Sequence, residues 1–476
     1  MRRSDSGSFL TVADSDQGDL VAGVPLFARD IEGVLILAFP RARLLPLFAA
    51  APACIGIIIS IQCANVNSAL GETGRAALSL LHQGYIGNPY SLPTGPTAHV
   101  SPVNTTAIAV VFVLFGDNSM ASRLVISLFC TLLYAANCWF VIRVCQLCNV
   151  RSWGLLLAIV LTCLVPFYLY DSVIIDRTWD QPFGTTILSA ALYVLVDAIY
   201  RRRRMAVAAA ALAVLAGLGD ITSPVVLPSI VLALAYLIYS RRDRHSMLRW
   251  SLISLAIIGV FIVPWGIRNE IMLGKFIMTR SDFGLVLAMG NHDGIDCEVD
   301  CTEAALLHPY SSEAAARRLA ATGEPAYMAD MTHQAERWVL AHPAETVKLT
   351  IRRIYLLFFP TRYMMSWIPV LHTAVWYLFI GYGALKLLAL VRVLTVGPRR
   401  FVWLVFTMLP LAPYAISFVN VRYSYIVIFP SICMIAVALS ATTTTSAADD
   451  HRDAGRAMPG TGVDLVAGAM SPRLDL

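Results

Sequence analysis

Long apolar runs separated by short polar segments dominate the hydrophobicity pattern of this 476-residue chain. Most runs approach the roughly 20 residues that an α-helix needs to cross a bilayer. Crossings are predicted at residues 44–64, 119–144, 152–170, 180–200, 205–218, 223–240, 249–265, 369–391, 401–419 and 424–441. The pattern therefore predicts an all-α polytopic membrane protein with about ten transmembrane helices.

Several segments between the crossings have helical periodicity but are too polar or too short to span. Residues 69–82 place Leu70, Ala76 and Leu80 at helical spacing, which predicts a short amphipathic surface helix. Residues 105–115 are apolar but too few to cross, so they are predicted as a second surface or re-entrant helix. Three further periodic segments, at 312–322, 325–341 and 344–358, predict a small external cap of surface helices.

These patterns divide the chain into five parts. They are an N-terminal cytoplasmic segment (1–43), a transmembrane module (44–265) with a first external loop (65–118), an external loop and cap (266–366), C-terminal transmembrane helices (367–441) and a disordered cytoplasmic tail (442–476). The cap contains few large apolar residues before Trp338, so it is not expected to fold as an independent domain.

The composition agrees with a membrane protein, because 57% of residues are hydrophobic and only 14% are charged, which excludes a soluble enzyme of this size. The net charge of +5 comes from short basic clusters between apolar runs, such as Arg201–Arg204. Such clusters mark cytoplasmic loops and are not a nucleic-acid-binding surface. Arginine is strongly preferred over lysine, which favours a bacterial source with a GC-rich genome. We therefore expect a multi-pass protein of the bacterial inner membrane.

The unusual polar residues fall at the predicted outer ends of the helices: Glu72, Asp171, Asp176, Arg177, Asp180, Asp220, Arg268, Arg280 and Arg422. Their clustering on one side favours a functional site at the outer surface. Glu72 lies in the first turn of the predicted surface helix, where the helix dipole favours an anion. It is either an ordinary loop acid or a general base whose pKa is set near the working pH by burial and neighbouring cations.

Among ten cysteines, Cys297 and Cys301 stand apart in a polar loop. Nearby acids such as Asp293 would allow metal binding, but no second cysteine pair completes a tetrahedral site. A disulfide is expected if the loop is extracytoplasmic, and free thiols otherwise.

Four stretches carry a family resemblance. They are GETGRAALSLLHQGYIGNPYSLPTGPTAHVSPV (71–103), PWGIRNEIMLGKFIMTRSDFGLVLAMGN (264–291), GEPAYMADMTHQAERWVLAHPAETVKLTIRRI (323–354) and VRYSYIVIFP (421–430). Their order, spacing and topology, over nearly all of residues 44–440, resemble the multipass GT-C glycosyltransferases. The similarity is to the bacterial group related to protein mannosyltransferases and lipid A aminoarabinose transferases.

This resemblance implies inverting transfer of a sugar from a polyprenyl-phosphate donor to a hydroxyl of a lipid, glycan or protein acceptor at the outer face of the membrane. The family carries an acid, usually Asp, in its first external loop, and Glu72 matches it as the general base. His99 and Asn104 stand where an aromatic residue is expected, a departure that affects acceptor contacts. The chain has no Gly-rich nucleotide loop, Walker pattern or DxD-like signature, which fits a lipid-linked donor.

The leaving group in this reaction is a phosphate, which the planar fork of Arg binds well. Arg268, Arg280 and Arg422 are the candidate phosphate ligands; the alternative is that they extend to the membrane interface. Supporting candidates are Arg75, Tyr85, His99, Asp176, Arg177, Asp180, Asn269 and Asn291. Asp180 either positions the acceptor, binds a divalent cation together with Glu72, or is a helix N-terminal acid. No metal ligands are assigned, and a divalent cation is only a candidate cofactor.

Two other functions compete with this one. A transporter or flippase for a lipid-linked saccharide would show charges or Gly/Pro breaks at mid-membrane in paired halves. Crossings two to four lack central charges, and no two halves look alike. The other competitor is a non-catalytic assembly partner of similar fold. Measurement of sugar transfer by a Glu72→Gln variant distinguishes the enzyme from both alternatives.

Overall fold

The computed structural model describes residues 54, 56–58, 61, 70–163, 181–201, 205–240, 243–295, 302–362, 364, 372–396 and 400–440. Within these ranges the elements are helices, and the β-type pairing is a single bridge between Gly87 and Pro96. Six described segments are long and apolar enough to cross a membrane: α5 (Met120–Leu147), α8 (Gln181–Arg201), α9 (Met205–Thr222), α11 (Arg244–Leu273), α17 (His372–Val396) and η5 with α20 (Val421–Val427 and Ile428–Ser440). The predicted fold class, an all-α polytopic membrane protein, is confirmed.

Three further predicted crossings correspond to shorter apolar helices. They are α6 (Ser152–Cys163), η2 with α10 (Pro224–Val226 and Leu227–Tyr239) and α18, η4 and α19 (Arg400–Thr407, Leu409–Leu411 and Ala412–Ile416). The last group is broken because Pro410 and Pro413 cannot donate the backbone hydrogen bonds that a continuous helix needs. The first predicted crossing lies mostly outside the described residues, so the count of ten stays a prediction.

Helix α20 lies at the centre of the membrane bundle. In the most apolar 18-residue stretch of η5 and α20, 72% of the residues are buried, whereas the corresponding share in α11, at the edge of the bundle, is 17%. Helix α20 packs on α17, α6 and α5, while α8 packs between α5 and α9, and α9 also contacts α10 and α11. Glycines allow close approach: a Cβ on Gly154 would meet Ser440 Oγ at 2.0 Å, and one on Gly217 would meet the Phe261 ring at 2.5 Å. Small residues at helix contacts are typical of membrane bundles.

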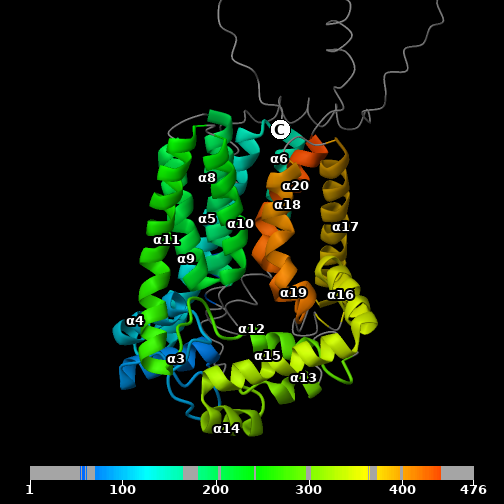
Figure 1. Ribbon diagram of the computed structural model, residues 1–476. Coiled ribbons are helices and arrows are strands. Elements are labelled where there is room, and N and C mark those ends of the chain that lie inside the picture. The colour runs from blue at the N-terminus through cyan, green and yellow to red at the C-terminus, as the bar shows by residue number, and fades with distance from the viewer. Residues whose placement is uncertain are drawn as a thin grey trace, which may run out of the picture.

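One end of the bundle, at the bottom of Figure 1, is covered by short helices. These are α3 (Glu72–Gln83), α4 (Pro102–Phe115), α12 (Phe283–Gly290), α13 (Thr302–Leu307), α14 (Glu313–Thr322), α15 (Glu324–Ala341) and α16 (Pro343–Phe358). We call this the cap end. The predicted surface helix at 69–82, the second one at 105–115 and the three cap helices all have counterparts here, within a few residues of the predicted limits.

Basic helix ends lie at the opposite end of the bundle. Helix α9 reaches the cap end with Ile221, whose carbonyl accepts a 2.9 Å hydrogen bond from Ser101 Oγ. Its first residue, Met205, and the nearby Arg201 at the end of α8 therefore lie at the far end. Helix α11 also begins there, at Arg244, because its later residue Arg268 contacts the first loop at the cap end.

Helix α11 is longer than the predicted crossing at 249–265. It begins earlier because Asp243 caps it by accepting a 2.9 Å hydrogen bond from the Ser246 N–H. It ends later, at Gly274 (φ 68°), because its last turns pack on the first loop. Arg268 therefore lies on a helix and not in a loop.

Candidate functional site

The first loop folds back over its own helix. Helix α3 ends at Gly84 in the left-handed conformation (φ 79°). Asn88 (φ 51°) then closes a turn by accepting hydrogen bonds from the N–H groups of Thr94 (2.9 Å) and Gly95 (2.8 Å). A Cβ on Gly87 would lie 2.5 Å from the Gly95 carbonyl oxygen, so only glycine permits this approach. The turn returns the chain across α3 and brings His99 next to Glu72.

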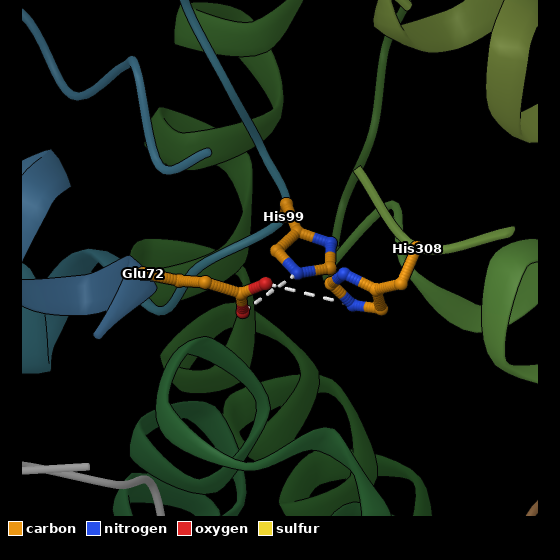
Figure 2. Close-up of side chains that lie close together, drawn as sticks. All are labelled: Glu72, His99 and His308. Carbon is orange, nitrogen blue, oxygen red and sulfur yellow. Dashed lines mark hydrogen bonds and ion pairs between the residues drawn. The ribbon is translucent and has the colours of Figure 1, made fainter. Parts of the chain in front are cut away.

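Glu72 is held between two imidazoles (Figure 2). Its Oε2 lies 3.0 Å from His99 Nε2, and its Oε1 lies 3.5 Å from His308 Nε2. The three side chains come from α3, the first loop and the turn after α13. They are largely buried, with exposed side-chain fractions of 12% for Glu72, 3% for His99 and 19% for His308.

The two imidazoles govern the ionisation of Glu72. Burial alone raises the pKa of its carboxyl, but the charges of His99, His308 and Arg280, with the hydrogen bond from His99, outweigh burial and lower it to about 2. The neighbouring imidazoles and Arg280 therefore favour the ionised carboxylate, which can accept a proton. For His99, burial lowers the pKa, but Glu72 raises it by more. The pKa of His308 is lowered by burial and by the charges of His99 and Arg422, although the Glu72 charge raises it.

Tyr90 packs beside both imidazoles. Its ring centroid is 5.3 Å from that of His99 and 6.2 Å from that of His308. Its hydroxyl is buried and has no hydrogen-bond partner within the described part of the chain. A buried polar group of this kind normally has a partner, so a water or ligand beside it is expected.

Glu324, on the first turn of α15, ties the cap to the first loop. Its carboxylate accepts hydrogen bonds from the Thr97 hydroxyl, from the Ala98 N–H at 2.8 Å and from the Ser281 hydroxyl at 2.7 Å. Its exposed fraction is only 3%. These bonds hold the extended segment that carries His99.

Arg280 and Arg422 carry guanidinium charges that act on this cluster. Arg280 Nε donates a 2.7 Å hydrogen bond to the His99 carbonyl, and its terminal nitrogen lies 3.0 Å from Asp282 Oδ2. Arg422 lies 5.8 Å from the centroid of the Tyr423 ring, and its charge acts on His308. The cap end therefore brings together the carboxylates of Glu72 and Asp282, two imidazoles and two guanidinium groups from five separate segments.

Arg268 also contacts the first loop. Its guanidinium donates to the carbonyls of Thr97 (2.8 Å) and Ile86 (2.7 Å) and to Asn269 Oδ1 (2.9 Å), and it lies 5.0 Å from the Trp265 ring centroid. These contacts brace the loop that positions His99.

The remaining described candidates make contacts within the protein. Arg75 donates to the Tyr90 carbonyl at 2.9 Å, and the Tyr85 hydroxyl accepts from Asn88 Nδ2 at 3.3 Å. Asn269 Nδ2 donates to the Ile277 carbonyl at 2.8 Å. Asn291 joins α12 to α19 by donating to the Ile416 carbonyl at 3.1 Å, away from Glu72. Asp176, Arg177, Asp180, Cys297 and Cys301 lie outside the described residues.

Sequence reasoning did not find His308, Glu324 or Tyr90. His308 and Glu324 are separated from the first loop by more than two hundred positions, and no local periodicity links them to it. The only signal was their position in the predicted cap. Tyr90 lay within the polar opening loop, but its role depends on which rings pack against it.

An apolar groove of about 790 Å³ opens between α4, α5, α8, α9 and α11. It is lined by side chains such as Ala107, Ile108, Phe129, Phe183 and Phe261. Its lining includes Pro102 and Val103, which directly follow the His99–Ser101 segment. The groove therefore lies next to the chain segment that carries His99.

No family model and no curated protein matches this chain in sequence. Solved structures that are similar to this chain include the following three. The Archaeoglobus fulgidus oligosaccharyltransferase in the apo form has a TM-score of 0.44 and 15% identity over 82% of this chain and 50% of that chain. AglB of the same organism, in complex with an inhibitory peptide and a dolichol-phosphate, has a TM-score of 0.44 and 13% identity over 87% and 52%. ArnT from Cupriavidus metallidurans bound to undecaprenyl phosphate has a TM-score of 0.38 and 12% identity over 84% and 78%. The present chain spans about half the length of the oligosaccharyltransferase chains that it matches.

Proposed function

We propose that this chain is a membrane glycosyltransferase of GT-C type that moves a sugar from a polyprenyl-phosphate donor to an acceptor hydroxyl, with inversion. The observation that carries the proposal is the Glu72 carboxylate, buried at the cap end between His99 and His308 with two guanidinium groups nearby. The proposed location is the bacterial plasma membrane with the site on the outer face, since basic helix ends lie at the opposite end of the bundle.

The proposed reaction is one displacement. The acceptor oxygen attacks the anomeric carbon, and its proton passes to a Glu72 oxygen. The bond between the anomeric carbon and the phosphate oxygen breaks, and the phosphate leaves with the electron pair. Attack from the face opposite to the phosphate inverts the anomeric centre. His99 and His308 hold the carboxylate in one orientation, so its position during attack needs no reorganisation.

We assign the donor phosphate to Arg280 and Arg422, whose charges act on Glu72 and on His308. Guanidinium groups stabilise the charge that develops on a departing phosphate. The Arg268 guanidinium donates to the carbonyls of Thr97 and Ile86, which both belong to the first loop, so its proposed part is to shape that loop. This changes the role that the sequence alone assigned to it.

The apolar groove supports a donor with a lipid tail. Its lining is almost wholly apolar, and it begins next to the segment that carries His99. A prenyl chain can occupy such a groove while its phosphate reaches the cap end. A nucleotide-sugar donor has no lipid tail that would fill it.

A transfer assay that does not require the acceptor to be known tests this proposal. Membranes containing the protein are mixed with polyprenyl-phosphate-linked hexoses or pentoses and a cell-envelope fraction, and free polyprenyl phosphate is measured. Wild type is expected to release it, and Glu72→Gln to lose about 100-fold or more of the rate. His333→Ala on α15, whose side chain is 73% exposed, is the matched control and keeps full activity. Equal release by wild type and Glu72→Gln at equal protein levels refutes the proposal.

A further inference from the structure

Asp282 is a carboxylate beside the Glu72 cluster that the proposed reaction does not use. It directly precedes α12, yet its side chain accepts no capping hydrogen bond from that helix. Its Oδ2 lies 3.0 Å from a terminal nitrogen of Arg280, and within the described part of the chain its Oδ1 has no hydrogen-bond partner. The side chain is 24% exposed and Oδ1 is not buried, which leaves one charged acceptor open to a ligand.

The segment before Asp282 is fixed to the first loop. The Arg280 Nε donates to the His99 carbonyl at 2.7 Å, and the Ser281 N–H donates to the Ala98 carbonyl at 3.2 Å. Asp282 follows Ser281 directly, so two hydrogen bonds set its position relative to His99. A residue held in this way needs little reorganisation to bind a ligand.

One half of the site lies around the proposed base. The imidazoles of His99 and His308 hold the Glu72 carboxylate at 3.0 Å and 3.5 Å. The charge of Asp282 acts on both imidazoles. Asp282 is therefore close to the group that accepts the proton in the proposed reaction.

The other half of the site lies around the proposed phosphate ligands. The rings of Tyr414 and Tyr423 stack with their centroids 4.2 Å apart and their planes at 4°, and the Arg422 guanidinium lies 5.8 Å from the Tyr423 centroid. The charges of Asp282 and Arg280 act on both tyrosines. The same carboxylate is therefore close to the proposed base and to both guanidinium groups.

In the proposed displacement the sugar ring occupies the space between Glu72 and the phosphate, because the acceptor oxygen attacks from the face opposite to the phosphate. We propose that Asp282 binds a hydroxyl of the donor sugar through Oδ1. A hydroxyl donates to a carboxylate in a charge-assisted hydrogen bond, which is stronger than a neutral one. The inference rests on the proposed function and deepens it, because it makes the donor a sugar that presents a free hydroxyl to Asp282.

The competing role of Asp282 is to orient Arg280 alone. An effect through Arg280 changes the affinity for a lipid phosphate whether or not a sugar is attached. A contact with a sugar hydroxyl lowers the affinity only for the sugar-linked lipid when it is lost. Polyprenyl phosphate and polyprenyl-phosphate hexose are therefore the two probes that separate these roles.

Binding of both lipids is measured on the full-length protein in nanodiscs without acceptor. Asp282→Ala is expected to lose about 10- to 100-fold in affinity for the hexose-linked lipid, and Asp282→Asn to lose less, because the amide oxygen still accepts without the charge. Both variants should bind polyprenyl phosphate at least as tightly as wild type, since a negative charge beside Arg280 is removed. The matched control is Asp330→Ala on α15, an acid that is 39% exposed and pairs with Arg318, and it should bind both lipids as wild type does.

Transfer from monodeoxy donors identifies the hydroxyl. Wild type is expected to use one donor that lacks a single hydroxyl about 10- to 100-fold less well than the parent hexose donor. Asp282→Ala should use these two donors equally, because the partner of that hydroxyl is already missing. Asp282→Asn carries the same tests if the unfolding midpoint shows that Asp282→Ala does not fold.

Two results overturn the inference and leave the proposed function standing. One is a loss of affinity in Asp282→Ala that is equal for the two lipids, because it assigns the effect to Arg280. The other is full discrimination among the monodeoxy donors by Asp282→Ala. Absence of transfer from every donor by folded wild type refutes the proposed function instead, while tighter binding of the hexose-linked lipid that depends on Asp282 still supports the sugar contact.

Discussion

Glu324 accepts a 2.8 Å hydrogen bond from the backbone N–H of Ala98, which lies 226 positions earlier in the chain. The same carboxylate accepts hydrogen bonds from the hydroxyls of Thr97 and Ser281. One side chain on α15 therefore holds two residues of the first loop and one residue next to it. His99 follows Ala98 directly. The position of His99 beside Glu72 therefore depends on a contact made by the cap and not by the first loop alone.

Replacing Glu324 with Gln should loosen the first loop. The amide keeps one acceptor oxygen but loses the charge and one acceptor, so at least one of three buried donors loses its partner at a cost of about 1–3 kcal/mol. We expect a lower unfolding midpoint and faster proteolysis within residues 85–101. The control is Glu313→Gln on α14, whose carboxylate is 61% exposed and pairs with Arg317, and which should change stability by less than about 1 kcal/mol. Equal midpoints for the two variants would show that Glu324 does not hold the loop.

Arg422 should determine how the donor phosphate is held. Arg422→Ala is expected to lower the transfer rate by about 100-fold and Arg422→Lys by less, because Lys keeps the charge but loses the bidentate fork. The measurement is the rate as a function of the concentration of the polyprenyl-phosphate donor. Arg317→Ala, at a side chain that is 72% exposed on α14, serves as the control. An unchanged donor dependence in Arg422→Ala would remove Arg422 from the phosphate site.

The apolar groove should discriminate donors by tail length. Ala107→Trp places an indole among the lining residues and is expected to reduce transfer from long polyprenyl donors more than from a donor with a two-unit prenyl tail. Val113→Trp, on the same helix but 63% exposed and outside the lining, is the control. The ratio of rates for long and short donors is the measurement. If Ala107→Trp reduces both rates equally, the groove does not hold the tail.

Gly290 should be irreplaceable at the end of α12. A Cβ there would lie 1.7 Å from the Ser417 carbonyl oxygen, so Gly290→Ala must separate α12 from the segment after α19. Overpacking of this kind costs about 1–3 kcal/mol. Gly381→Ala in α17 meets no atom within 4 Å and should be neutral or slightly stabilising, because Ala is the better helix former. Unfolding midpoints of the two variants test this difference, and a neutral Gly290→Ala would contradict it.

The helical architecture could be predicted because a membrane imposes it. Backbone groups in hydrocarbon must bond within their own helix, so the length of an apolar run nearly determines the element. The predicted crossings at 119–144 and 180–200 match α5 and α8 closely for this reason. The extent of α11 beyond its predicted end was missed, because its last turns are stabilised by the first loop and not by lipid.

The site residues were predictable only in part. Glu72 and His99 were selected because both lie in one polar loop that resembles a known family. Arg268 was predicted to lie at the same end of the bundle as a phosphate ligand, but its contacts with Thr97 and Ile86 could not be inferred, since nothing in the local sequence specifies which carbonyls a guanidinium will reach.

By itself, the sequence determined that this is an all-α membrane protein, and it predicted that uncommon charges such as Glu72, Arg268, Arg280 and Arg422 gather at one end of the bundle, because hydrophobic run length and charge placement are local properties of the chain. Only the tertiary structure decided that Glu72 faces two imidazoles, with His308 supplied by the cap. That decision depends on packing between segments more than two hundred residues apart, where a shift of a few ångströms would separate these side chains without changing any local pattern.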